Sequence, residues 1–188
     1  MTTDAFQKNL AQLAVSAKQC LEKDQYMSAL VLIYSLIDTF AWAVASRTET
    51  NTRTRFEHWL EKFVYPTAPL PCTPGELYAA RCGILHTLTP EADLHKRSKL
   101  RQIAYAWGNA KIETFDSTSQ LIGADKFVGI HIEHLLSAIC SGVDNTSIAA
   151  GNDAKLKRNL DDAAARHFLH VPPKTLERIA SAAKNASY

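Results

Sequence analysis

The chain has 188 residues, of which 46% are hydrophobic and 21% are charged, and its formal net charge is +2. A chain of this length buries enough surface to fold as one domain without a metal or disulfide bridges. The small positive charge by itself gives no support to nucleic acid or a membrane as a partner. The sequence does not begin with a basic region followed by an apolar run, so we expect no signal peptide. Its cysteines form no C-x-x-C pair, which favours reduced thiols in a cytoplasmic protein.

The first half of the sequence predicts four helices, at about 4–23, 26–46, 52–64 and from Pro74 to the region 87–90. The second contains an apolar stretch of about 17 residues interrupted by Asp38, and a membrane span usually needs about 20. We therefore expect a buried helix in the middle of a bundle or between two subunits. The segment Thr73-Pro-Gly-Glu76 predicts a capped start for the fourth helix, after an irregular proline-rich connection at 65–71.

The second half predicts a mixture of elements. Residues 103–107 alternate enough for a strand, and 111–115 predict a second strand, which gives a small β-hairpin that turns at Gly108. A helix is expected at about 125–141, a turn-rich linker at 142–153, and two final helices at about 152–169 and 173–186. We divide the chain into a helical core at 1–92 and a packed extension at 93–188, with one continuous domain as the alternative.

Arg81 and His86 lie on a helix segment of otherwise apolar and small residues. Residues five apart lie about 140° apart on an ideal helix, so the two side chains share no stripe. His86 is near the helix end, however, and the long arginine can reach around; a two-fold dimer would also bring two such pairs together. Arginine binds phosphate with a fixed fork of donors, and histidine transfers protons near neutral pH. These two residues are therefore candidates for cutting RNA without a metal.

The segment Arg81-Cys-Gly-Ile-Leu-His86 is an R-x4-H motif late in the fourth helix. With the residues before it, Leu-Tyr-Ala-Ala, it resembles small bacterial members of the HEPN superfamily, and the resemblance covers about residues 5–90. It implies a mainly α fold, a HEPN-like up-and-down helical bundle, to which the C-terminal helices and the hairpin are additions.

The same resemblance carries functional expectations. It implies a homodimer whose cleft is a metal-independent endoribonuclease site, with Arg81 and His86 as catalytic residues, RNA as substrate and no cofactor. The wider family works in defence, toxin–antitoxin and RNA-processing systems, so an antitoxin or another partner protein is also implied.

Cys82 departs from the family pattern, because active members often carry asparagine, aspartate or histidine directly after the arginine. A thiol is a weaker hydrogen-bonding group. Three interpretations therefore stay open: a working ribonuclease, a non-catalytic helical module that binds nucleotide, RNA or protein in the same cleft, and a structural pair of Arg81 with a carboxylate.

Asp38 is the candidate carboxylate, since it is a lone charge in an apolar helix and an unpaired buried charge is costly. It can pair structurally with Arg81 or Arg101, cap neighbouring backbone, or orient Arg81 in the cleft. Tyr34 and Tyr78 each lie one turn from a candidate residue, and each is either a cleft residue or an ordinary core residue.

A basic run follows the fourth helix and supplies the candidate substrate-binding residues Lys96, Arg97, Lys99 and Arg101. Such a run would attract a phosphate backbone beside the motif, and its alternative is a solvated loop. The pairs His131-x-x-His134 and His167-x-x-His170 could bind zinc if they converged with a carboxylate such as Glu133, but no cysteine or acidic spacing completes the set. We therefore expect no metal site, and the sequence contains no nucleotide-hydrolase or serine-hydrolase motif.

Overall fold

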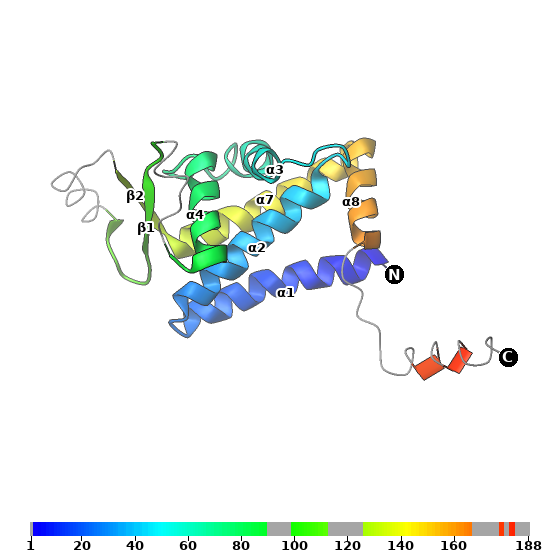
Figure 1. Cartoon of the computed structure of the whole chain (residues 1–188), viewed down its shortest axis with the longest axis horizontal. Coiled ribbons are helices and arrows are strands. Elements are labelled where there is room, and N and C mark those ends of the chain that lie inside the picture. Colours follow the sequence, from blue (N-terminus) through cyan, green and yellow to red (C-terminus); the bar gives the residue numbers. More distant parts are fainter. Residues whose placement is uncertain (1, 90–98, 113–125, 167–176, 179–180, 183–188) are drawn as a thin grey trace.

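A computed structural model of the chain describes residues 2–89, 99–112, 126–166, 177–178 and 181–182. In these ranges the fold is mainly helical, as predicted, with a two-stranded sheet at one end of a helical bundle and helix α8 at the other (Figure 1). The elements are α1 (Thr2–Glu22), α2 (Tyr26–Val44), α3 (Thr52–Trp59), η1 (Leu60–Val64), α4 (Pro74–Thr87), β1 (Gln102–Ala106), β2 (Phe127–His131), α7 (Ile132–Asn152) and α8 (Ala154–Arg166). The predicted helix at 173–186 lies mostly outside the described ranges.

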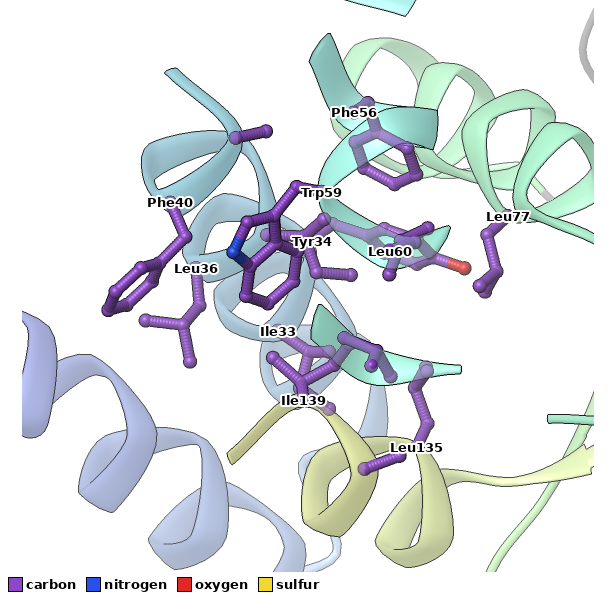
Figure 2. Packing of buried hydrophobic residues seen from close by; sticks show 14 of the residues in the cluster. Ile33, Tyr34, Leu36, Phe40, Phe56, Trp59, Leu60, Leu77, Leu135 and Ile139 are labelled. Carbon is purple, nitrogen blue, oxygen red and sulfur yellow. The ribbon is translucent and has the colours of Figure 1, made fainter. Parts of the chain in front are cut away.

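Helix α2 lies at the centre of the bundle and contacts α1, α3, α4, α7 and α8. Side chains from α2, α3 and α7 meet around Tyr34 and Trp59, both fully buried (Figure 2). The hydrophobic cluster runs from Phe6 in α1 to Ala164 in α8, so both halves of the sequence contribute to one core. This position explains the apolar circumference of α2.

Among the described helices, α2 alone is long and apolar enough to cross a membrane by length and composition. However, α2 contacts other helices on several sides. A helix at the centre of a core needs apolar residues around most of its surface, and this packing accounts for the apolar composition of α2.

The predicted β-hairpin is wrong. The strand at 103–107 exists as β1, but it pairs in parallel with β2, with Ile103 opposite Val128 and Tyr105 opposite Ile130. Lys111 lies outside any strand, and 113–115 lie outside the described residues. The residues of β2 were expected to open a helix at 125; Val128 and Ile130 are instead buried on the sheet, where β-branched side chains pack well.

The predicted linker at 142–153 is also wrong, because α7 continues to Asn152. Its small and polar residues contact η1, a π-helical turn that follows α3 where the sequence predicted continuous α-helix. The Asn145 amide donates to the Phe63 carbonyl at 2.8 Å, and Trp59 Nε1 donates to Thr146 Oγ1 at 3.0 Å. Residue types that are typical of a turn thus form a helix-packing surface.

Candidate functional site

The start of α4 is fixed by the capping box that the sequence predicts. The Thr73 hydroxyl accepts from the Glu76 N–H at 3.2 Å, and the Glu76 carboxylate accepts from the Thr73 N–H at 2.7 Å. Proline at the first helical position adds a preset backbone angle. The helix ends at Leu88, whose left-handed backbone (φ 53°) closes it directly after the turn that carries His86.

Arg81 brings the two other candidate residues together. Its Nε and Nη2 lie 2.8 and 2.7 Å from Asp38 Oδ2, and its Nη1 lies 3.3 Å from His86 Nε2. The arginine therefore spans the angular separation that the five-residue spacing imposes. Since guanidinium nitrogens only donate hydrogen bonds, Nε2 of His86 accepts in this contact, which places the imidazole proton on Nδ1.

The guanidinium of Arg81 is largely buried, with 16% of its side chain exposed, and Asp38 retains 22%. Desolvation would lower the pKa of Arg81, but the hydrogen bond and charge of Asp38 outweigh it and raise the pKa above its ordinary value. Asp38 Oδ1 is buried and accepts no hydrogen bond from any described residue. Asp38 thus holds Arg81 with one oxygen and has the other unused.

Tyr78 and Cys82 complete the surroundings of the pair. The Arg81 guanidinium carbon lies 5.9 Å from the centre of the Tyr78 ring, within the range of a cation–π contact. Burial raises the pKa of the Tyr78 hydroxyl, and the neighbouring Cys82 thiol raises it further. Tyr78 is therefore a neutral residue at physiological pH and supplies ring surface to Arg81.

Tyr34 does not belong to this site. It is fully buried, and its hydroxyl lies 2.6 Å from that of Tyr105 in β1. Of the two tyrosines that the spacing suggested, Tyr34 links the bundle to the sheet, and Tyr78 contacts the arginine.

The candidate substrate-binding residues of the basic run have different positions. Lys96 and Arg97 lie outside the described residues, and Lys99 is exposed. Arg101 forms a two-pronged ion pair with the buried Glu76, with Nε 2.6 Å from Oε1 and Nη2 3.0 Å from Oε2. Its guanidinium joins the start of α4 to the start of β1.

A pocket of about 190 Å³ opens beside the Arg81–Asp38 pair, lined also by Ala41, Trp42, Thr52 and Arg55. Sequence reasoning missed Trp42 and Arg55. Trp42 lies four residues after Asp38 on the same helix, so its place on that face was available from spacing. Arg55 comes from α3, and no sequence pattern indicates which face of α3 lies against α2.

Metal binding finds no support in the described part of the chain, where no three potential ligands converge. His131 is paired through Nδ1 with Glu133 at 2.6 Å, and His134 is exposed. His167 and His170 lie outside the described residues.

Comparisons of the chain with models of known protein families, with curated proteins and with solved structures find no match. Arguments about function therefore rest on the geometry of Asp38, Arg81 and His86.

Proposed function

We propose that the chain is a metal-independent endoribonuclease of HEPN type, cytoplasmic and active as a homodimer, in a defence or toxin–antitoxin setting. The contact between Arg81 Nη1 and His86 Nε2 carries this proposal. It joins a phosphate-binding cation to a proton-transfer group on the exposed end of α4, while Asp38 orients the cation from α2.

The chemistry follows from what each group can do. When a phosphate takes over the Nη1 donor of Arg81, His86 Nε2 is released from that contact. This nitrogen then removes the proton from a ribose 2′-hydroxyl, and the 2′ oxygen attacks the adjacent phosphorus. Arg81 donates to the phosphate oxygens as negative charge accumulates on them. The bond from phosphorus to the 5′ oxygen then breaks, and that oxygen takes up a proton. The products are a 2′,3′-cyclic phosphate and a 5′-hydroxyl.

A homodimer supplies what one protomer lacks. The reaction needs a group that removes a proton and a group that returns one, and this chain has one histidine in the site. A two-fold axis through the exposed end of α4 would set a second Arg81 and His86 opposite the first. We therefore place the active site at the dimer cleft.

A non-catalytic binding module is the second candidate, and two observations favour it. Arg81 already gives two of its nitrogens to Asp38, which reduces its freedom to follow a reacting phosphate. Cys82 stands where a stronger hydrogen-bonding residue would support catalysis. In this case the same cleft binds a nucleotide, RNA or a protein without turnover.

The test is cleavage of labelled RNA by the purified chain in EDTA, followed by analysis of the ends. We expect cleavage with 2′,3′-cyclic phosphate ends, which Arg81→Ala and His86→Ala abolish. His134→Ala, which removes an exposed histidine of α7, is the matched control and should cleave normally. Binding without cleavage would favour the binding module, and cleavage that EDTA abolishes would contradict the metal-independent mechanism.

A further inference from the structure

Two hollows adjoin each other along α2 and α3. The first is the pocket of about 190 Å³ beside Arg81, and the second, of about 460 Å³, lies between the end of α2, α3 and the start of α8. Ala41 and Arg55 line both hollows, which places the two side by side in one depressed region that leads away from Arg81. We call this depression the Arg55 groove.

Besides Arg81, the cations of the Arg55 groove are Arg55, Lys62 and Lys155, and His58 lines it as well. The Arg55 guanidinium contacts the neutral Thr52 hydroxyl, at 3.3 Å. Two residues earlier on the same helix, Arg53 is instead held by the Glu57 carboxylate at 2.7 Å. Arg55 therefore points a charge into the groove that a ligand anion can approach.

Two carboxylates line the larger hollow, and both accept hydrogen bonds from backbone. Glu49 Oε1 accepts from the Asn51 N–H at 2.7 Å. Asp153 Oδ1 accepts from the Lys155 and Leu156 N–H groups, at 2.9 and 3.0 Å, as the cap of α8. These bonds stabilise helix starts. Asp153 also attracts Lys62 and Lys155, so a phosphate at this end competes with Asp153 for the two lysines, while Arg55 contacts the neutral Thr52.

The end of the groove nearest Arg81 has a different character. Trp42 contributes indole surface to it, and the Arg166 guanidinium lies 5.0 Å from the centre of that ring. Asp38 lines the same end, and its Oδ1 is a buried acceptor with no donor among the described residues. That oxygen is covered by neighbouring atoms, so the indole is the surface that a nucleoside can use. A base offers a flat face, which stacks on aromatic rings and on guanidinium planes.

We infer that the Arg55 groove binds single-stranded RNA next to the phosphate at Arg81. Trp42 stacks on one base, Arg55 contacts the following phosphate, and Lys62 and Lys155 contact the backbone beyond it. A duplex presents phosphates but keeps its bases stacked inside, so it would leave the Trp42 end empty. This inference rests on the proposed function, because it assigns a strand path to the same site.

The test measures binding apart from cleavage. In the His86→Ala background, the probe is a short fluorescein-labelled single-stranded oligoribonucleotide with 2′-O-methyl groups, which lack the attacking hydroxyl. We expect Arg55→Ala to raise the Kd about tenfold, the effect of losing one charged hydrogen bond, and to reduce the salt dependence of log K by about 0.7. Fluorescence anisotropy over a range of salt concentrations gives both values.

A second pair of variants keeps the test valid if Arg55→Ala fails to fold. Lys155→Glu and Lys157→Glu make the same change in charge two residues apart on exposed positions of α8, and only Lys155 lines the groove. Lys157 is instead paired with Asp161 at 2.6 Å. We expect Lys155→Glu to raise the Kd several times more than Lys157→Glu does.

The outcomes separate the groove from the catalytic proposal. Equal effects of the two lysine variants, or binding of the matched duplex as tight as that of the single strand, would overturn the groove. Cleavage by the wild-type chain together with unchanged binding in Arg55→Ala would also overturn the groove and leave the ribonuclease standing. Binding that depends on Arg55 without any cleavage would support the groove and contradict the ribonuclease.

Discussion

Arg81 carries a full positive charge although its side chain is largely buried. A buried charge is costly unless neighbouring groups compensate for the loss of water. One oxygen of Asp38 in α2 accepts from two nitrogens of Arg81, and Tyr78 provides a ring face one turn earlier on α4. Removing the charge of Asp38 would leave the guanidinium partly desolvated and unpaired, which is costly. The pair thus contributes to stability and also orients the arginine beside His86.

We predict that Asp38→Asn lowers the free energy of unfolding by about 1–3 kcal/mol, because the largely buried Arg81 loses its counter-charge. Asp161→Asn is the matched control, since its pair with Lys157 is 46% and 65% exposed, and exposed pairs contribute about 0–1 kcal/mol. Urea-induced unfolding measures both. Equal decreases in the free energy of unfolding of the two variants would show that the Asp38–Arg81 pair contributes no more than an exposed ion pair does.

Glu76 is a second buried charge, with 5% of its side chain exposed, and it links α4 to β1 through Arg101. Desolvation would raise the pKa of Glu76 above its ordinary 4.5, but hydrogen bonds from Arg101 and the Thr73 backbone outweigh it and lower the pKa. As the pH falls below 4.5, Glu76 in the unfolded chain therefore binds a proton, while Glu76 in the folded chain is still ionised. The free energy of unfolding falls as pH decreases through this range.

We predict that Glu76→Gln is less stable than the wild type at pH 7 by about 1–3 kcal/mol, because the ion pair with Arg101 is lost. The difference in free energy of unfolding between the two proteins should narrow as the pH falls below 4.5 towards the lower pKa of folded Glu76. In that range Glu76 of the wild type becomes protonated and loses the ion pair that the variant lacks. Urea-induced unfolding at a series of pH values measures this. A difference that stays constant down to pH 3 would contradict the role given to Glu76.

At the scale of the elements, the packing of α7 on η1 depends on the absence of one side chain. A Cβ at Gly142 would lie 2.4 Å from Val64 Cγ2 and 3.3 Å from Trp59 Cη2. Gly142 therefore permits the approach that also lets Asn145 reach the Phe63 carbonyl. In the sequence alone, Gly142 indicates a turn. Its role in the close packing of α7 is visible only once the position of η1 is known.

We predict that Gly142→Ala lowers the free energy of unfolding by about 1–3 kcal/mol, because the added methyl group forces Val64 and Trp59 to move. Gly151→Ala on the same helix is the matched control, as no atom lies within 4 Å of its added Cβ. That variant should be neutral or up to about 1 kcal/mol more stable, from helix propensity. Denaturation curves in which Gly142→Ala matches the control would refute the close contact.

For the whole molecule, local patterns predicted α1 to α4, α8 and the capping box, because helical period and cap residues lie in neighbouring positions. The bounds of α7 were mispredicted, since its start follows a strand and its end looks like a linker. The sheet was mispredicted because β1 pairs with a segment 25 residues later, from Gln102 to Phe127, and no local pattern records that partner. The site divides in the same way. Arg81, His86 and Asp38 were candidates from residue type and spacing, and the structure brings the three together. Arg55 lies beside them only through the packing of α3 against α2.

We propose that Arg81 and His86 act as one unit on RNA, and the cleavage rates of the two single variants and of the double variant measure whether they do. In EDTA, Arg81→Ala and His86→Ala should each lower the cleavage rate by about 100-fold or more. The double variant should be no slower than the slower single variant, because residues that act as a unit are not additive. Cleavage at the wild-type rate in either single variant, or losses that multiply in the double variant, would contradict the claim.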